Sequence, residues 1–141
     1  MKIKKLHKFN IRIYYEDTDA GGIVYHSKYL NFAERARTEF LRKSKLDQFM
    51  IEKKYGLIFV VKNLNINYKS FACLDDNLLI VTCISKLNKV KVVFSQFIYK
   101  NEKLLAKLEV VCCCLNKNRR VARINNQIYD RLKKYRGEAN E

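Results

Sequence analysis

Residues 14–26 read YYEDTDAGGIVYH, a run of acids, paired glycines and aromatic residues. The acids and the glycines, Gly21 and Gly22, are typical of turns rather than of strands or helices. The run therefore predicts a loop that carries two aspartates, Asp17 and Asp19. Glycine also lets a loop turn sharply and lets another molecule approach the backbone closely.

The segments on either side of this loop predict a strand and then a long helix. Over residues 9–15, apolar side chains alternate with mostly polar ones, which is the period of a half-buried strand. The apolar positions are Phe9, Ile11, Ile13 and Tyr15. From about His26 to Arg42, apolar residues return every three or four positions, as in an amphipathic helix with Ser27 as its N-cap. On the polar side we expect the ion pairs Glu34 with Arg37 and Arg35 with Glu39.

Beyond Gly56 the sequence predicts four long strands. Residues 58–69, 77–87, 90–99 and 104–115 are rich in β-branched, aromatic and leucine residues. The short connections favour antiparallel neighbours, and a short strand over 120–124 and a basic helix over about 126–136 follow. One long helix cannot cover both faces of such a sheet. We therefore expect the sheet to wrap around the helix and its other face to meet a second subunit.

Length and composition predict a single domain over residues 1–141, with a core at about 8–124. The chain has 141 residues, of which 48% are hydrophobic, enough for one well-packed core. No apolar run has the length of a membrane span, and the N-terminus lacks the apolar segment of a signal peptide. We expect a cytoplasmic protein.

Five cysteines raise the question of a metal site, a disulfide or a catalytic thiol. They contain no C-x-x-C pair, and the two histidines lie far apart, so we expect no metal. Cys112, Cys113 and Cys114 lie within an apolar run from Leu108 to Leu115. We expect these thiols to be free and buried, as suits a reducing compartment.

The loop and the start of the helix resemble one known family. YYEDTDAGGIVYH, followed by the residues ERAR at 34–37, is similar to the hot-dog-fold acyl-CoA thioesterases of the 4-hydroxybenzoyl-CoA type. It is most similar to their Tol-Pal-associated, YbgC-type branch, and the likeness runs from about Arg12 to Val121. The resemblance implies an α+β hot-dog fold, with an antiparallel sheet wrapped around one long central helix. It also implies hydrolysis of acyl-CoA or acyl-carrier-protein thioesters without a metal or an organic cofactor.

Thioester hydrolysis needs a carboxylate or an activated water at the carbonyl carbon, and donors for the developing oxyanion. The junction of loop and helix offers both, because a helix N-terminus presents unpaired N–H groups. The residues alone do not choose between Asp17 and Asp19 as the catalytic acid. The resemblance implies Asp19 as nucleophile or general base, and Asp17 as a residue that builds the loop by accepting local N–H bonds.

The resemblance implies roles for further residues around the loop. His26 lies where the helix N-terminus would polarise the carbonyl, and its imidazole would assist or place water. Tyr15 is either a supporting residue of the pocket or part of the core, and Gly22 lies where substrate would pass the backbone. Glu34 lies in the helix that carries catalytic acids in other hot-dog branches, but we expect it to form an ion pair.

The charge predicts an anionic partner, since 29 Lys and Arg face 14 Asp and Glu, a net charge of +15. The phosphates of CoA, or the pantetheine arm of acyl carrier protein, are sufficient partners, and an anionic membrane surface is another. We expect Lys89 and Lys91 to contact CoA phosphates, because Asn88 stands where related enzymes often carry Arg. No nucleic-acid-binding motif accompanies the charge, so we expect no nucleic acid.

We expect a homodimer or a homotetramer, and the resemblance alone suggests peripheral association with the inner membrane. Two other functions stay open. One is a non-catalytic partner protein of acyl carriers or of phospholipid synthesis. The other is a basic nucleic-acid-binding protein, for which the net charge is the argument.

Overall fold

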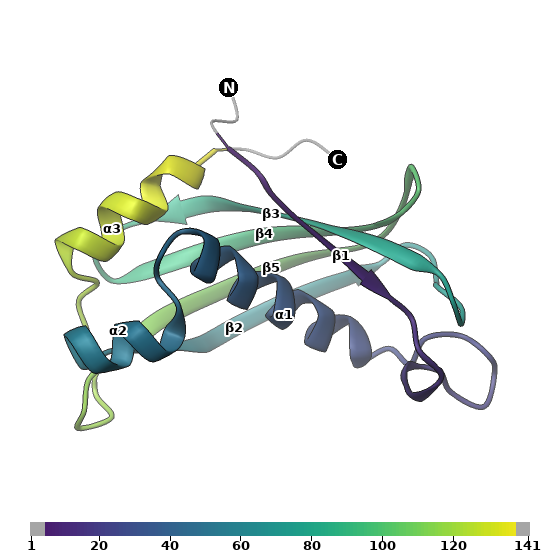
Figure 1. Ribbon diagram of the computed structural model, residues 1–141, viewed down its shortest axis with the longest axis horizontal. Coiled ribbons are helices and arrows are strands. Elements are labelled where there is room, and N and C mark those ends of the chain that lie inside the picture. Colours follow the sequence, from purple (N-terminus) through teal and green to yellow (C-terminus); the bar gives the residue numbers. More distant parts are fainter. Residues whose placement is uncertain (1–4, 138–141) are drawn as a thin grey trace.

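The structure is a computed structural model that describes residues 5–137, so both ends of the expected domain lie outside the described residues. An antiparallel sheet and one long helix dominate it (Figure 1). The strands are β1 (His7–Arg12), β2 (Ile58–Tyr68), β3 (Asn77–Leu87), β4 (Lys91–Lys100), β5 (Lys103–Leu115) and β6 (Val121–Ala122). The helices are α1 (Lys28–Lys43), α2 (Gln48–Tyr55) and α3 (Asn126–Leu132), with single 3-10 turns η1 (Tyr15–Asp17) and η2 (Lys133–Tyr135).

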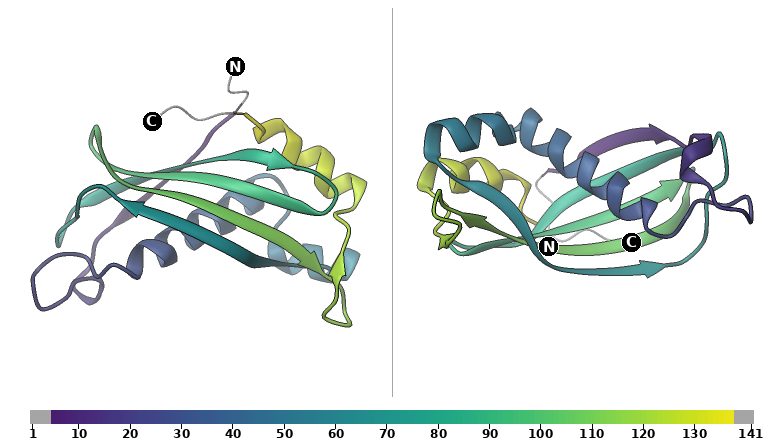
Figure 2. Two further views of the ribbon diagram at one scale, coloured as in Figure 1. Left: turned by 180° about the vertical axis from the view of Figure 1, so that it is seen from behind. Right: turned by 90° about the horizontal axis from the view of Figure 1, so that it is seen from below.

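The strands lie in the order β1-β3-β4-β5-β2, with β6 beside the end of β5, and all neighbours are antiparallel. The sheet curls around α1, which crosses its concave face (Figure 2). This is the predicted α+β arrangement of a sheet around one long helix. The expectation that β2 and β3 are neighbours is wrong, because β2 pairs with β5 and residues 69–76 cross over to β3.

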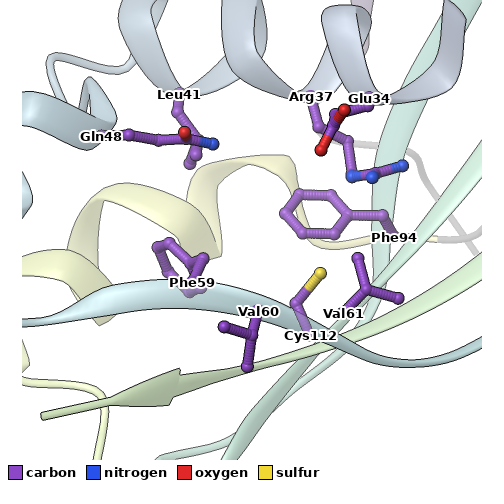
Figure 3. A pocket seen from close by; sticks show the side chains of 9 residues that line it. All are labelled: Glu34, Arg37, Leu41, Gln48, Phe59, Val60, Val61, Phe94 and Cys112. Atoms are coloured by element: carbon purple, nitrogen blue, oxygen red, sulfur yellow. The ribbon is translucent and has the colours of Figure 1, made fainter. Parts of the chain in front are cut away.

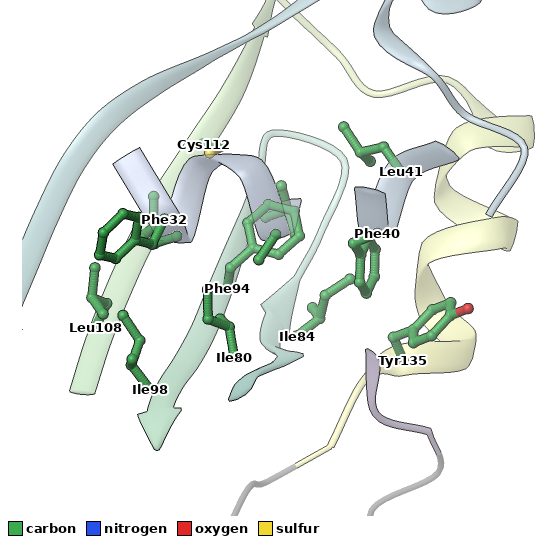
Figure 4. Packing of buried hydrophobic residues seen from close by; sticks show 14 of the residues in the cluster. Phe32, Phe40, Leu41, Ile80, Ile84, Phe94, Ile98, Leu108, Cys112 and Tyr135 are labelled. Atoms are coloured by element: carbon green, nitrogen blue, oxygen red, sulfur yellow. The ribbon is translucent and has the colours of Figure 1, made fainter. Parts of the chain in front are cut away.

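The core lies between α1 and the sheet (Figure 4). Phe32 and Phe40 are buried on α1, and Ala33 and Ala36 let the helix axis approach the strands. The ring of Phe40 packs edge-on against Phe94, with centroids 5.6 Å apart. Loss of a buried ring of this kind costs about 3–5 kcal/mol, so this contact fixes the helix on the sheet.

The outer face of the sheet is apolar as well. Four side chains on this face are buried: Val81, Val93, Phe97 and Cys113. They point away from the helix, since residues next to them along the same strands belong to the core around α1. Figure 2 shows this face from behind, and no helix of residues 5–137 lies over it. A second subunit on this face stays a prediction.

The structure differs from the sequence prediction at the end of the first strand. β1 ends at Arg12, and Tyr15 lies in the turn η1 with 81% of its surface exposed, so it is not a core residue. The cause is Asp17, whose carboxylate accepts the N–H of Tyr14 (2.9 Å) and closes the turn. A backbone held in such a turn cannot continue the hydrogen-bonded ladder of the sheet.

Three helical details also differ from the sequence prediction. The helix α2 is not expected from the sequence. It starts at the N-cap Asp47, whose side chain accepts the N–H of Met50 (3.1 Å), and it ends at the left-handed Gly56. Ser27 is the N-cap of α1 by position, but its side chain makes no capping bond. The last predicted helix is α3 followed by η2.

Candidate active site

The loop between β1 and α1 is held by backbone hydrogen bonds. Asp19 N–H donates to the carbonyl of Ile23 (2.9 Å), and Gly22 N–H donates to the carbonyl of Asp19 (3.0 Å), so the tip of the loop is closed. Val24 N–H donates to the carbonyl of Ala72 (2.9 Å), which ties the loop to the crossing segment 69–76. These bonds explain why a sequence of turn formers holds one conformation.

The two aspartates of the loop have different surroundings. Asp17 is buried, with 4% of its surface exposed, and Lys28 Nζ lies 3.9 Å from its carboxylate. Its backbone carbonyl also accepts the N–H of Tyr25 (2.9 Å). Asp17 therefore builds the loop, as the resemblance implies.

Asp19 instead exposes its carboxylate at the tip of the loop. Its Oδ1 accepts the N–H of Gly21 (2.8 Å), while Oδ2 has no hydrogen-bond partner within residues 5–137. A Cβ at Gly21 would lie 3.2 Å from Oδ1, and Gly22 has a φ of +82°, which only glycine adopts at no cost. The carboxylate of Asp19 is thus fixed by one oxygen and open at the other.

His26 lies two residues before the first turn of α1. Its imidazole is exposed beside the ring of Tyr25, with centroids 4.5 Å apart. The backbone N–H groups of His26 and Ser27 have no hydrogen-bond partner in the described part of the chain. They stand at the positive end of the dipole of a 16-residue helix. Such free donors are suited to an anionic oxygen.

Exposed aromatic and aliphatic side chains surround the loop. Tyr14, Tyr15 and Tyr25 are exposed on the loop itself, and Phe71 and Leu74 are exposed on the crossing segment. An antiparallel bridge between Ile23 and Cys73 joins the two segments. An exposed apolar surface of this kind is typical of a binding site or an interface between chains.

A cavity of about 320 Å³ lies between α1 and β2 (Figure 3). Six of the nine residues that line it are apolar: Leu41, Phe59, Val60, Val61, Phe94 and Cys112. The three polar ones are Glu34, Arg37 and Gln48. Figure 3 shows the guanidinium of Arg37 above the ring of Phe94 and the sulfur of Cys112. The volume and the lining are those of a small-molecule site.

Arg37 corrects the predicted polar face of α1. It is buried, with 7% of its surface exposed, and its Nη1 donates to Gln96 Oε1 (2.9 Å). Gln96 Nε2 donates in turn to the carbonyl of Ala33 (2.9 Å) and to Thr82 Oγ1 (3.1 Å). Burial lowers the pKa of Arg37, while the nearby Cys112 and Glu34 act in the opposite direction.

The second predicted ion pair is replaced by another one. Glu39 pairs with Arg42, one turn further along α1, rather than with Arg35.

The burial of the polar residues Arg37 and Gln96 was not predicted from the sequence. A signal for each was present. Arg37 follows Ala33 by four residues and precedes Phe40 by three, which places it on the apolar face of the helix. Gln96 takes an inward position of β4, between Phe94 and Ile98.

Lys89 and Lys91 lie at the other end of the sheet from the Asp19 loop. Lys89 Nζ donates to Asn126 Oδ1 and lies 4.4 Å from the ring centroid of Tyr129. The 11 residues of β3 separate this hairpin from the loop, about 36 Å of extended chain. Within one chain, the structure does not bring these lysines to Asp19 (Figure 1).

The cysteines do not form a reactive site. Cys112, Cys113 and Cys114 are free, buried thiols, as predicted. Cys83 is buried as well, and Cys73 is half-buried. Burial raises the pKa of Cys112 to about 11 and that of Cys114 to about 12, so both stay protonated thiols at neutral pH. Within residues 5–137, no three metal-ligating side chains come together, and no helix is long and apolar enough to cross a membrane.

Comparisons relate these features to known proteins. The Thioesterase-like superfamily matches residues 14–132. The chain is 45% identical over 108 residues to the acyl-CoA thioesterase YbgC of Haemophilus influenzae, covering 77% of this chain and 79% of that protein. It is 43% identical over 114 residues to the acyl-CoA thioester hydrolase YbgC of Escherichia coli, covering 79% and 83%.

A solved structure supports the same relation. The crystal structure of a Bartonella henselae protein, described as a probable thioesterase, matches with a TM-score of 0.83 and 34% identity. The match covers 86% of this chain and 100% of that chain. The superfamily match includes the Asp19 loop, α1 and the strands from β2 to β6.

Proposed function

The chain belongs to the thioesterase-like superfamily and to its YbgC-type branch, and from that premise we propose that it hydrolyses acyl-CoA thioesters. The hot-dog fold expected from the sequence is confirmed by the same relatives and by the sheet around α1. One observation carries the proposal. The open Oδ2 of Asp19 and the unpaired N–H groups of His26 and Ser27 lie on one loop.

Asp19 supplies the attacking group in this proposal. In one route its carboxylate attacks the thioester carbonyl carbon, the C–S bond breaks, CoA leaves as a thiolate, and water then hydrolyses the acyl-aspartate anhydride. In the other route the carboxylate takes a proton from a water molecule that attacks the same carbon. Both routes use the oxygen that Gly21 leaves free.

The start of α1 stabilises the negative charge that develops on the carbonyl oxygen. The free N–H groups of His26 and Ser27 donate to this oxygen, and the dipole of α1 adds to their effect. The exposed imidazole of His26 assists as a further donor or holds the water molecule. Tyr15 and Gly22 form the rim along which the substrate reaches Asp19.

The cavity between α1 and β2 accepts the acyl group. Its apolar members, Phe59 and Phe94 among them, suit a hydrocarbon or aromatic group, and its volume of about 320 Å³ is in the range of ligand sites. Arg37 and Glu34 give one part of the cavity a polar character.

We place a second subunit beside the free edge of β2. This strand has 11 residues and, within residues 5–137, pairs only with β5. Val61 and Tyr68 on it are 47% and 45% exposed. A long edge strand without a partner is open to pairing with another chain. A homodimer formed there continues the sheet, and the apolar outer face then offers a second contact for a tetramer.

In such an assembly, Lys89 and Lys91 of one subunit serve the phosphates of CoA bound beside Asp19 of the other. The hairpin of these two lysines and the Asp19 loop lie at opposite ends of one sheet, which supports a site shared between chains. Cytoplasmic location, acyl carrier protein and the inner membrane surface stay predictions from the sequence.

The test is steady-state hydrolysis of a panel of acyl-CoA esters with short, long and aromatic acyl groups. Thiol release is followed for the wild-type protein and for Asp19→Asn as the matched control. We expect wild-type turnover on at least one acyl class and its loss in the variant. A folded protein that hydrolyses no member of the panel would favour the non-catalytic acyl-carrier partner instead. Salt-dependent binding of RNA or DNA would favour the nucleic-acid alternative.

A further inference from the structure

A second cavity, of about 360 Å³, lies at the end of α1 that is remote from the Asp19 loop. Five cationic side chains line it: Lys5, Lys43, Lys45, Arg131 and Lys134. They come from three parts of the chain, before β1, at the end of α1 and on α3 with η2. No carboxylate of the described residues lines this cavity. We call it the cationic cavity.

The neighbouring protein groups hold some of these cations in place. Arg131 Nη1 donates to the carbonyl of Lys45 (3.1 Å) and, more weakly, to that of Ser44 (3.4 Å). Lys5 Nζ lies 5.2 Å from the ring centroid of Tyr135, a favourable contact between a cation and an aromatic face. These contacts hold Arg131 and Lys5 at the cavity, while Lys43, Lys45 and Lys134 are exposed at its rim.

The hydroxyl of Ser44 lacks a partner in this cavity. Ser44 lines the cavity, and its Oγ is buried without a hydrogen-bond partner in the described chain. Buried hydroxyl groups in folded proteins normally have a partner. Its oxygen has almost no accessible surface, so a ligand oxygen would become its partner only after the side chain rotates toward the cavity.

The nearby carboxylates are used elsewhere. Glu39 pairs with Arg42, and Asp130 lies 3.6 Å from Lys133. The charge of Lys43 also acts on a buried residue: the pKa of His7 is lowered mainly by burial and in addition by Lys43. Five like charges around one space repel one another until an anion enters it.

We propose that the cationic cavity binds a phosphate group with two negative charges, as in a phosphomonoester or a pyrophosphate. Several cations around one space match the oxygens of such a group. The phosphate belongs to a soluble compound or to a lipid headgroup, two sources with one chemistry. The site is separate from thioester hydrolysis, because the 16 residues of α1 hold the two ends about 24 Å apart.

Two double variants test the proposal. Lys43→Gln with Lys134→Gln removes two cations of the cavity, and Lys8→Gln with Lys103→Gln removes two elsewhere. All four side chains are exposed, so both variants should fold. Inorganic pyrophosphate is titrated into each protein by calorimetry at low salt. In the second arm, each protein is sedimented with phosphatidylcholine vesicles, with and without phosphatidate, whose headgroup is a phosphomonoester.

We expect the cavity variant to bind at least about tenfold more weakly than the wild type, because charge-assisted hydrogen bonds are lost. The control variant should bind within about twofold of the wild type, because exposed charges outside the site are screened. A selective loss for pyrophosphate identifies a soluble phosphate as the ligand, and a selective loss for phosphatidate vesicles alone identifies a lipid headgroup. Equal losses in the two variants, or no binding in either arm, would overturn the proposal.

Discussion

The hydroxyl of Tyr68 donates a hydrogen bond of 2.7 Å to the backbone carbonyl of His26. The last residue of β2 thereby holds the chain at the point where α1 is about to begin. The ring of Tyr68 also packs edge-on against Tyr29 in the first turn of the helix, with centroids 5.6 Å apart. The position of the free N–H groups at the start of α1 thus depends on the edge strand.

Tyr68→Phe should lower kcat while leaving the protein folded. The variant keeps the ring contact with Tyr29 and loses only the bond to His26. We expect about a tenfold loss of kcat, since the oxyanion donors are less well positioned, and a loss of about 1 kcal/mol in the free energy of unfolding. Tyr99→Phe, which removes the same atom from a tyrosine on β4, is the control. Equal kcat values in the two variants would contradict a positioning role.

Asp19→Asn should abolish most of the activity without unfolding the protein. Its side chain is exposed and the substitution keeps an oxygen for the N–H of Gly21. Loss of the attacking carboxylate should reduce kcat by about 10² or more. The measurement is kcat on the best substrate of the acyl-CoA panel, together with the urea denaturation midpoint. Near-normal turnover would remove Asp19 from the mechanism.

The matched variant, Asp17→Asn, should lose more stability and less activity than Asp19→Asn. Asp17 is buried, accepts the N–H of Tyr14 and lies near Lys28. We expect it to lose about 1–3 kcal/mol of unfolding free energy, the cost of weakening a buried charged acceptor, with a smaller loss of kcat. An inactive Asp17→Asn variant of normal stability would mean that the two acids have exchanged roles.

Much of the fold could be predicted because its signals are local. The helical period from Tyr29 to Phe40 and the apolar strands after Gly56 give α1 and the long strands directly. The neighbour of β2 could not be predicted in this way, since pairing with β5 depends on where residues 69–76 cross. The helix α2 has only eight residues and exposes Phe49, so no clear period marks it.

The site was predicted less completely because it depends on burial. Asp17 and Asp19 are the same residue type two positions apart, and only the surrounding hydrogen bonds make one structural and leave the other open. Arg37 carries a charge that indicates solvent, while its spacing indicates the core, and the acceptor Gln96 lies 59 residues away. Contacts at that separation have no local signal in one sequence.

Gln96→Leu should destabilise the protein more than removal of both members of its hydrogen bond with Arg37. The single variant leaves a buried guanidinium without its acceptor, which costs about 1–3 kcal/mol or more for a charged group. The double variant Arg37→Leu with Gln96→Leu removes this charge and should regain part of that loss. Urea denaturation of the single and double variants measures the coupling. A strictly additive cycle would show that the two side chains are energetically independent.

Charge reversal of Lys89 and Lys91 to Glu should raise KM for CoA esters and leave kcat mostly intact. Contacts to the phosphates stabilise the ground and transition states alike, and the effect should shrink at high salt. Mixing this variant with Asp19→Asn subunits then tests whether the site is shared. In a mixed dimer, the charge-reversed subunit still has Asp19 and the Asp19→Asn subunit still has both lysines. If the site is shared between chains, these groups form one intact site with the wild-type KM. A mixture without such recovery would move the phosphate contact elsewhere, with Arg119 and Arg120 as the next candidates.

His26 carries two groups that our proposal uses, its backbone N–H and its imidazole, and substitution separates their contributions to kcat. His26→Ala keeps the backbone N–H and the carbonyl that accepts the hydroxyl of Tyr68, so the start of α1 should stay in place. It removes only the exposed imidazole beside Tyr25. Activity in this variant therefore measures the backbone donors and the helix dipole alone.

We expect kcat of His26→Ala to fall by about 10² to 10³, the loss that follows removal of an oxyanion donor. The reason is that the imidazole is exposed and its ring neighbour Tyr25 is itself 45% exposed, so little packing is lost and the contribution of the ring is expected in the reaction. His26→Gln retains a side-chain N–H donor and should recover part of the activity. A loss of about tenfold or less, equal to 1.4 kcal/mol, in both variants would assign the oxyanion to the backbone N–H groups and leave Asp19 and the start of α1 as the catalytic apparatus.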